Sequence, residues 1–338
     1  MDLVSVSFKR FVEGVLRLPQ EVLDGLRLTA RLFYCEPGWC DYSPFGMYLL
    51  GVARHCSSEN LTRFYAGLCD HADEVCGLLG FTRLPPYSTV AHFFNTRIAG
   101  RVTELVDAGR QLLERTCKDL GQLRSMDGKV MASTHCEAEF NPHYKKTMYK
   151  GIVEWDLDLL VPLKSFIASG VADERPYSLQ THEQLKHLKT QLRVLDGGYY
   201  DFKHYCLNAV MPTLIYFPQE TNASENPGEE LQKSYRKHWQ HGAYEVGATV
   251  TNQIKFLLSI QEHEPVGRYY RDLQVLESKN NPTEYYHKKH ERSLVETCNS
   301  LLDNRGMANR VKHASKKQAE RDLHWTCHAL QIQKLTQL

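Results

Sequence analysis

The stretch Arg193-Val-Leu-Asp-Gly-Gly-Tyr199 predicts the end of a buried strand followed by a tight turn. Val-Leu enters the acidic residue as a core strand would, and the Gly-Gly pair lets another backbone or a ligand approach closely. Ligand sites in open α/β sheets favour strand ends, so Asp196 is a candidate site residue. An Asp-Gly pair after a strand is also an ordinary turn, and that alternative stays open.

The sequence around Asp196 alternates between strand and helix signals. Three strands followed by helix-strand-helix-strand predict an α/β protein with a mixed sheet flanked by helices. The stretch 218–283 is less regular, with polar loops around an apolar piece, and we interpret it as an insertion before the final helices. The expected strands surround Asp127 and cover 151–155, 159–167, 194–195 and 213–217, and the expected helices cover 179–192, 201–209 and 284–338.

Residues 1–118 carry apolar side chains near the helical period, so we expect a mainly helical N-terminal domain. A turn at Gly80 separates two expected helices, and Ser88 is a candidate N-cap for the second. This arrangement is typical of a helix-turn-helix. A plain helical packing module would show the same pattern, and both interpretations stay open.

Two further acidic residues stand in suggestive contexts. Asp127 lies in Arg124-Ser-Met-Asp-Gly-Lys129, where the polar upstream residues make a poor strand and Asp-Gly favours a turn. Glu296 lies in an apolar helical run, with Arg292 four residues earlier on the same face. Glu296 is therefore either a metal-facing carboxylate or a solvated residue paired with Arg292, and Glu291 is a rival for the functional role.

Length and charge limit the class of protein. The 338 residues suffice for about two domains at a prior of roughly 150 each. Hydrophobic residues make up 42% and charged residues 24%, as in soluble globular proteins. Because the net charge is only +1, DNA binding would require local basic surfaces. The stretches 144–146 and 312–321 are candidates, although short charge runs are usually just solvated faces.

Targeting signals and metal motifs are weak. The first residues lack the basic start and apolar core of a secretion signal, and the uncharged stretch 42–53 falls short of the ~20 residues of a membrane helix. We therefore expect a cytoplasmic protein without membrane contact. Ten cysteines without a Cys-x-x-Cys predict free thiols. The pairs His287/His290 and His324/His328 would bind zinc only if further ligands converged.

Taken together, the three acidic motifs resemble those of a known enzyme family. Ser-Met-Asp127-Gly, the strand-end motif Asp196-Gly-Gly-Tyr199, and Tyr286-His-Lys-Lys with Arg292-Ser-Leu-Val-Glu296-Thr are similar to the catalytic motifs of DDE transposases. The likeness is to insertion-sequence families four and five of bacteria and archaea, and it covers the chain from about 119 to its end. It implies a ribonuclease H-like catalytic domain over 119–338. The region 1–118 resembles the family's DNA-binding region more loosely, through Leu78-Leu-Gly-Phe81, Pro86 and Ser88-Thr-Val90.

The resemblance implies a function and a set of site residues. Asp127, Asp196 and Glu296 would bind two Mg²⁺ or Mn²⁺ ions and serve DNA cleavage and strand transfer. Two family positions differ, because Lys289 replaces a tyrosine and Asp303 replaces a lysine. These departures leave the three acids in place but put the family's usual phosphate contacts in doubt. Contacts to DNA would come from Tyr199, Tyr286, Lys288, Lys289, Arg292, Ser88 and Thr89.

The partners implied by the resemblance are the terminal inverted repeats of a mobile element and its target DNA. A homo-oligomer would bring the two element ends together, and the protein would be nucleoid-associated when bound to DNA. Two alternatives stay open: a nuclease of the same fold that cuts without joining, and an inactive or domesticated remnant that only binds DNA.

Overall fold

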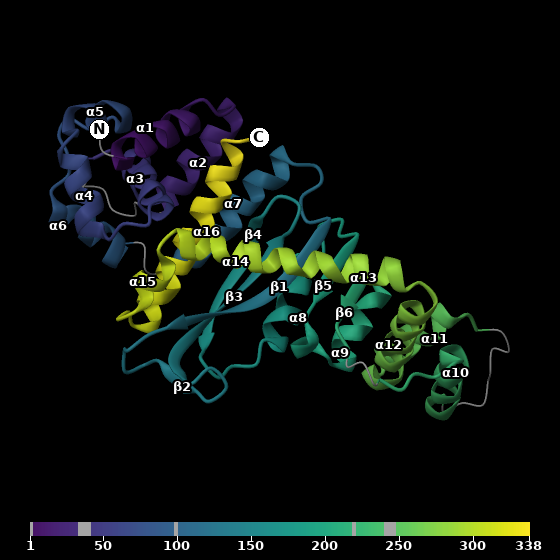
Figure 1. Cartoon of the computed structure of the whole chain (residues 1–338). Coiled ribbons are helices and arrows are strands. Elements are labelled where there is room, and N and C mark those ends of the chain that lie inside the picture. Colours follow the sequence, from purple (N-terminus) through teal and green to yellow (C-terminus); the bar gives the residue numbers. More distant parts are fainter. Residues whose placement is uncertain (1–2, 33–41, 98–100, 218–220, 240–247) are drawn as a thin grey trace. The chain divides into compact units, whose positions relative to one another are not determined.

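The computed structural model describes residues 3–32, 42–97, 101–217, 221–239 and 248–338, and it shows an α/β protein with a mixed sheet (Figure 1). Contacts between residues divide the chain into two compact units. Unit 1 comprises Met1–Leu120, Gly128–Ala172 and Thr297–Leu338, and unit 2 comprises Gly121–Asp127 and Asp173–Glu296.

Six strands form the sheet, in the order β2-β3-β1-β5-β6, with β4 paired to β3. The β2-β3 and β3-β4 pairs are antiparallel, whereas β1-β5 and β5-β6 are parallel. The predicted mixed sheet with accompanying helices is confirmed. The strands are β1 (Leu123–Ala132), β2 (Glu139–Asn141), β3 (Lys146–Asp156), β4 (Val161–Ser169), β5 (Leu192–Leu195) and β6 (Thr213–Ile215).

The strand expected around Asp127 is confirmed, because β1 runs through Asp127 and Gly128 without the turn that an Asp-Gly pair favours. The competing signal for a turn came from the Asp-Gly pair and from the weak strand preference of the neighbouring residues. In the sheet, β1 lies between β3 and β5. Hydrogen bonds to neighbouring strands outweigh local propensity at such a position.

The described part of the N-terminal region is helical, as predicted. Helix α5 ends at Gly80, which adopts the left-handed conformation (φ 69°) that glycine tolerates best. The next helix, α6, begins at Tyr87 after Pro86, so the N-cap predicted at Ser88 is wrong. The helices are α1 (Leu3–Leu16), α2 (Gln20–Leu32), α3 (Pro44–Cys56), α4 (Leu61–Cys69), α5 (Ala72–Leu79), α6 (Tyr87–His92), the π-helix η1 (Phe93–Arg97) and α7 (Val102–Thr116).

Helix α16 (Lys316–Leu335) is the central helix of unit 1 and packs against α3, α7 and β4 (Figure 1). It begins with a capping box in which Ser315 and Gln318 exchange side-chain and backbone hydrogen bonds. The apolar face predicted for this helix is buried, with Trp325 and Ile332 fully inaccessible. Shorter helices precede α16 in the C-terminal segment: α14 (Leu294–Asn304) and α15 (Met307–Val311).

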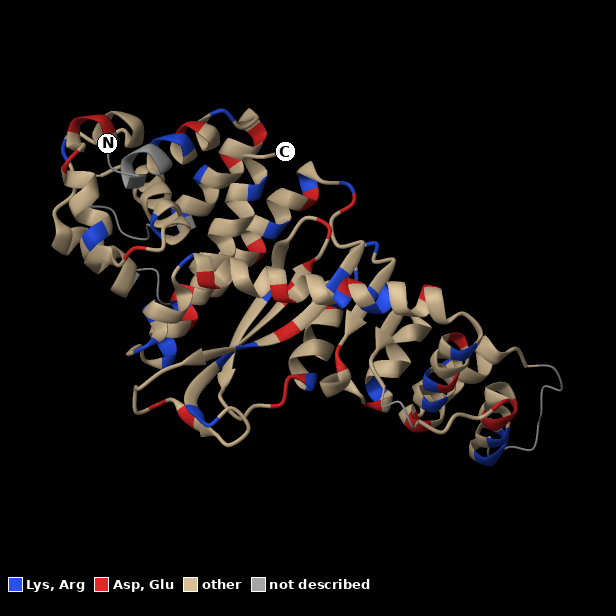
Figure 2. Ribbon diagram, viewed as in Figure 1, with Lys and Arg blue, Asp and Glu red and all other residues tan. Residues whose placement is uncertain are grey.

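Unit 2 surrounds β5 and β6 with helices. The stretch predicted to be an irregular insertion, 218–283, is helical over most of its described residues. Leu231, Ile254 and Val266 from three successive helices share one buried cluster, which explains why the segment is ordered. On α10 acidic residues occupy the first turn and basic residues the last, whereas α12 carries both kinds along its length (Figure 2). The helices of unit 2 are α8 (Arg175–Gln184), η2 (Gly197–Tyr199), α9 (Phe202–Tyr205), η3 (Cys206–Ala209), α10 (Pro227–His238), α11 (Val250–Ser259), α12 (His263–Asn280), α13 (Pro282–His290) and η4 (Glu291–Ser293).

The division into units does not follow the boundary predicted near residue 118. Unit 1 joins the N-terminal helices to the β3-β4 hairpin and to the C-terminal helices. A separate DNA-binding domain over 1–118 therefore stays a prediction. None of the described helices is long and apolar enough to cross a membrane.

Candidate active site

Asp127 lies on β1, and Asp196 directly follows the neighbouring parallel strand β5. The β1-β5 register pairs Leu123 with Leu192 and Ser125 with Val194, and the same offset joins Asp127 to Asp196. The Ser125 hydroxyl donates to the Val194 carbonyl at 2.6 Å, which holds the register just before the two acids. Because adjacent strands lie about 4.8 Å apart, the register brings the two aspartates next to each other.

Arg292 lies between the two carboxylates. Its Nη2 atom is 3.3 Å from Asp127 Oδ1 and 3.3 Å from Asp196 Oδ2. The two acidic oxygens therefore lie no farther apart than twice that distance. Since the side chains are 18% and 36% exposed, respectively, solvent and a ligand can reach them. One guanidinium thus balances two carboxylates at an open edge of the sheet.

The Gly-Gly pair after β5 holds one carboxylate oxygen of Asp196 in place. Gly198 N–H donates to Asp196 Oδ1 at 2.8 Å, so this oxygen caps the short helix η2. A Cβ atom at Gly198 would lie 3.0 Å from the same oxygen, which is tighter than an ordinary contact. The turn and the candidate site therefore share one residue, with Oδ1 serving the turn and Oδ2 facing Arg292.

Glu296 reaches the same arginine from α14. Its Oε1 atom lies 3.7 Å from Arg292 Nη1, and its side chain is 76% exposed. The rival Glu291 lies 3.9 Å from His287 Nδ1 instead. The segment is not one continuous α-helix, because the 3-10 turn η4 separates α13 from α14. Among the two glutamates, the described ion pairs place Glu296 beside Arg292.

Tyr199 lies under the site. It is 1% exposed, and its hydroxyl donates to Glu174 Oε2 at 2.8 Å. Burial, followed by the negative charges of Glu174, Asp127 and Asp196, raises the pKa of Tyr199 well above its usual value. The ring is enclosed in the core, and the DNA contact by Tyr199 stays a prediction that would require this ring to become exposed. Glu174, which lies in a charged run, carried no signal in the sequence.

Tyr216 is a site neighbour that the sequence analysis missed. It directly follows β6, and its N–H donates to the Leu195 carbonyl at 3.1 Å. The charges of Arg292 and Asp196 both influence the pKa of Tyr216, which burial raises. The signal that could have identified it is its position, since Tyr216 follows the third parallel strand as Asp196 follows the second.

The lysines predicted to contact phosphates have partners within the protein. Lys288 lies 2.9 Å from carboxylate oxygens of both Glu277 and Glu284, and these ion pairs raise its pKa. Lys289 Nζ lies 4.3 Å from the centre of the Tyr216 ring and 5.4 Å from that of Tyr286.

The remaining predicted DNA contacts have accessible side chains. The Tyr286 side chain is exposed, and DNA binding by Tyr286, Lys288, Lys289 and Arg292 stays a prediction. Ser88 is exposed and Thr89 half-buried on α6 of unit 1, whereas the carboxylates belong to unit 2. Binding of DNA by these two residues also stays a prediction.

Carboxylate oxygens are the ligands that Mg²⁺ prefers, so Asp127 and Asp196 suit it in kind. The guanidinium of Arg292 now provides the positive charge that such an ion would supply. Within the described ranges, no group of three or more His, Cys, Asp or Glu lies close enough together to hold a metal ion. A triad that includes Glu296 would therefore require its exposed side chain to move.

The histidine pair on α16 has a structural role. His324 Nδ1 lies 2.7 Å from the Ser165 hydroxyl, and His328 Nε2 lies 2.6 Å from the Tyr48 hydroxyl. Burial lowers the pKa of His328 to about 4, so this ring is neutral near pH 7. Buried hydrogen bonding, rather than zinc, accounts for these two residues. The eight cysteines in the described ranges are free thiols, as predicted.

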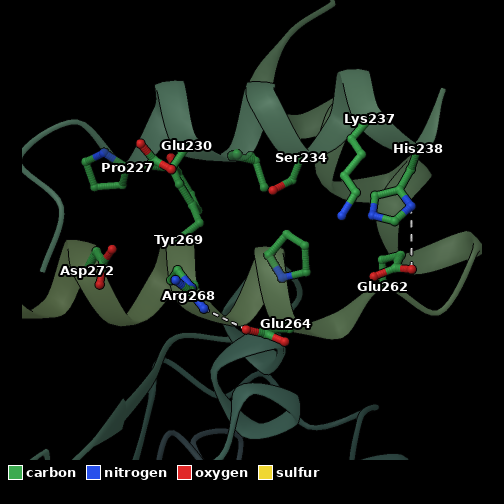
Figure 3. A pocket seen from close by; sticks show the side chains of 12 residues that line it. Pro227, Glu230, Ser234, Lys237, His238, Glu262, Glu264, Arg268, Tyr269 and Asp272 are labelled. Atoms are coloured by element: carbon green, nitrogen blue, oxygen red, sulfur yellow. Dashed lines mark hydrogen bonds and ion pairs between the residues drawn. The ribbon is translucent and has the colours of Figure 1, made fainter.

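A pocket of about 310 Å³ lies elsewhere in unit 2, between α10 and α12 (Figure 3). Its lining charges are largely matched, since Arg268 pairs with Glu264 at 2.6 Å and His238 with Glu262 at 3.6 Å. None of the three predicted acids lines it. The pocket therefore contributes no group to the carboxylate site.

Comparisons of the chain with protein-family models, curated proteins and solved structures found no match. The chemistry of the site is therefore argued from its own geometry. Two adjacent, partly exposed carboxylates at strand positions that meet can bind a divalent cation or a cationic group. Arg292 shows that they attract positive charge.

Proposed function

We propose that the chain is a DDE-type DNA transposase whose Asp127 and Asp196 bind divalent metal ions for phosphodiester cleavage and strand transfer. The observation that carries this proposal is the closeness of the two aspartates, which follow the last paired residues of β1 and β5 by the same number of positions and both contact Arg292 Nη2 at 3.3 Å. The strand order β4-β3-β1-β5-β6 supports a ribonuclease H-like sheet with the first acidic strand in the middle. Glu296, joined to the pair through Arg292, supports the third position of the triad.

The chain's own residues would prepare the site for DNA. Asp127, Asp196 and Glu296 would together hold two Mg²⁺ or Mn²⁺ ions. Such ions supply an activated oxygen nucleophile and stabilise the leaving oxygen. Arg292 would leave the carboxylates and turn its guanidinium to a phosphate, which it can bind with two N–H groups. Tyr199 and Glu174 support the floor of the site through their hydrogen bond.

The proposed substrates are the inverted repeats at the ends of a mobile element and a target duplex, acted on by a homo-oligomer in the cytoplasm. A second candidate is a DNA-binding remnant without activity. Its supporting observation is the position of Arg292, which already neutralises both aspartates. A nuclease that cuts without joining would use the same carboxylates and differs only in its products.

Cleavage assays with the full chain test the proposal. The parent should cut duplexes carrying element ends only when Mn²⁺ or Mg²⁺ is added, and Asp127→Asn or Asp196→Asn should reduce the rate by roughly 10³-fold, because a neutral amide loses the charge that the ions require. Pre-cut ends offered with a target duplex then separate a transposase, which joins them, from a nuclease, which does not. Absent cleavage by the parent would support the inactive remnant, whereas metal-independent cleavage would contradict the metal-binding role of the aspartates.

Glu296→Gln and Glu291→Gln form a matched pair for the third acid. Each change removes one negative charge, from η4 in the case of Glu291 and from the adjoining helix α14 in the case of Glu296. Glu296→Gln should reduce cleavage by at least about 10²-fold, whereas Glu291→Gln should change it less than about threefold. The reverse result would show that Glu291 is the ligand.

A further inference from the structure

Two lysine-containing segments, far apart in sequence, meet in unit 1. The backbone N–H of Thr134 donates to the Lys312 carbonyl at 2.8 Å. The N–H of Lys316 donates to Glu137 Oε2 at 2.8 Å. These bonds hold the turn between α15 and α16 against the segment that leads from β1 into β2. The two stretches that were separate candidates in the sequence therefore belong to one surface.

The tip of the β2-β3 hairpin has a fixed shape. Asn141 is buried, and its Oδ1 atom accepts hydrogen bonds from the N–H groups of His143 and Tyr144 at 2.9 and 3.2 Å. Its Nδ2 atom donates to the Gly170 carbonyl at 2.6 Å. Lys145 completes the turn in the left-handed conformation (φ 51°). Side chains on this tip are thus presented by an ordered backbone.

Aromatic rings project from the hairpin. Phe140 is 60% exposed and Tyr144 is 43% exposed. Strand alternation explains the first, because its neighbour Asn141 points inward. Since β2 ends the order of paired strands, Phe140 lies on an edge strand, and Tyr144 lies in the turn that follows it. Single exposed rings are common, but two beside a cluster of lysines suit contact with nucleotides.

Five exposed lysines lie on the hairpin tip and on the turn between α15 and α16, and we call them the basic ridge. None has an ion-pair partner among the residues that the structure describes, and Figure 2 shows basic ribbon at the α15-α16 turn. Three acids lie near the ridge: Glu139 hydrogen-bonds to Ser169, Glu137 accepts from Lys316 N–H, and Glu320 lies 3.9 Å from His324 Nε2 and interacts with the charge of Lys316. The ridge consists of Lys145, Lys146, Lys312, Lys316 and Lys317.

The two halves of the ridge are close enough for one ligand. Glu137, which contacts Lys316, and Asn141, which pairs with Lys146, are four residues apart. Four residues span at most about 14 Å. This bound applies to the backbone positions next to the two halves of the ridge, and it corresponds to about four phosphates, which repeat every ~3.4 Å along one DNA strand.

We infer that the basic ridge is a DNA-binding surface, separate in its residues from the carboxylates and independent of metal. The inference builds on the proposed function, because it assigns a backbone-binding surface to the same duplex substrate. Ammonium groups bind phosphates without reading sequence, so the ridge binds duplex DNA of any sequence. Phe140 and Tyr144 contact sugars or frayed bases beside it.

The test measures binding of the full chain to a short fluorescent duplex of arbitrary sequence, without divalent metal. The variant Lys145→Ala/Lys146→Ala/Lys316→Ala/Lys317→Ala removes four ridge charges. A control, Lys186→Ala/Lys189→Ala/Lys203→Ala/Lys279→Ala, removes four exposed lysines elsewhere. The ridge variant should bind at least about tenfold more weakly at 50 mM salt, and its salt slope should fall by roughly 0.9 per lysine. The control should keep the slope of the parent, and thermal unfolding verifies that both variants fold.

Several outcomes would overturn the inference. Equal loss in both variants would show a general charge effect. Parent-like DNA binding by the ridge variant, with loss of binding to vesicles of phosphatidylserine and phosphatidylcholine, would assign the lysines to a membrane surface instead.

The inference and the proposed function fail separately. Asp127→Asn/Asp196→Asn should abolish cleavage but keep the parent's salt slope. If the parent cuts DNA and the ridge variant binds normally, the ridge inference is wrong and the catalytic proposal stands. If the ridge variant loses binding and the parent never cuts, the converse holds.

Discussion

Two clusters of acidic and basic side chains in this molecule differ in the solvent access of their carboxylates. In unit 2, Arg292 joins Asp127 and Asp196, and the Asp196 side chain is 36% exposed. In unit 1, Asp322 lies 3.1 Å from Arg321 Nε and 3.8 Å from His55 Nε2, and its side chain is only 12% exposed. We call them the open cluster and the buried cluster.

Burial controls protonation in the buried cluster. It lowers the pKa of Arg310 to about 9, with the neighbouring charge of Arg54 acting in the same direction. It also lowers the pKa of His55 to about 3, although Asp322 opposes the shift. The pKa of Asp322 is lowered overall, because His55, Arg321 and Arg310 outweigh its desolvation. These groups can change partners only if the core opens, so their role is structural.

The open cluster can exchange its positive charge without unfolding. A metal ion can replace Arg292 beside Asp196 most easily, because the Asp196 carboxylate is the more exposed of the two and exposed ion pairs are worth only about 0–1 kcal/mol. The same residue types therefore support the fold in one region and offer a binding site in the other. The comparison makes three quantitative predictions.

The largest effect concerns the carboxylates themselves. Asp322→Asn leaves the buried arginines without their anion and should lower the free energy of unfolding by about 3–5 kcal/mol. Asp196→Asn keeps the oxygen that caps η2 and should cost less than about 1 kcal/mol. Urea denaturation at neutral pH measures both. Similar losses in the two variants would remove the distinction between the clusters.

A smaller effect comes from pH. The folded-state pKa values of His55 and His328, about 3 and 4, lie below the unfolded value of 6.5. The folded protein thus binds fewer protons than the unfolded chain in this window, and stability falls as pH drops from 6.5 toward 4. Each histidine should contribute a loss on the order of 2 kcal/mol by pH 5. The lowered pKa of Asp322 affects stability only at lower pH, below about 3.8.

Denaturation at pH 7 and pH 5 measures this loss, and His328→Gln provides the control. Glutamine does not titrate but retains hydrogen-bonding groups beside Tyr48. The variant should lose less stability between the two pH values than the parent. An unchanged pH dependence would mean that His328 is protonated in the folded protein.

The smallest effect tests whether the open cluster exchanges cations. Arg292→Ala removes the competing charge between Asp127 and Asp196, so the Mn²⁺ concentration that gives half-maximal thermal stabilisation should fall by roughly tenfold, equivalent to about 1.4 kcal/mol. Arg292→Lys keeps a positive charge and should lie closer to the parent. Weaker Mn²⁺ binding by the alanine variant would make Arg292 a support of the metal site rather than its competitor.

The two aspartates illustrate how far sequence reasoning reached. Val194, Leu195 and the following Gly-Gly carry a local signal, so the strand and turn at Asp196 were predictable. Asp127 lacks such a signal, and its strand depends on pairing with partners distant in the chain. The strong preference of Asp-Gly for a turn was overcome there by tertiary hydrogen bonds.

The residues that surround the two aspartates were harder to predict from the sequence. The 3.3 Å contacts from Arg292 to both aspartates join residues 96 and 165 positions apart, and no local pattern predicts such an encounter. Tyr199 also shows that a local motif does not predict tertiary surroundings. Its motif predicted a DNA contact, but packing around β5 enclosed its ring.

The sequence alone determined the alternation of strands and helices, the helical N-terminal region and the positions of the three acids along the chain, because local periodicity and turn chemistry encode these features. Only the tertiary structure decided that Asp127 faces Asp196, that Arg292 balances both, and that two distant lysine segments form one ridge. Register and burial decide such encounters, and both depend on how all the elements pack together.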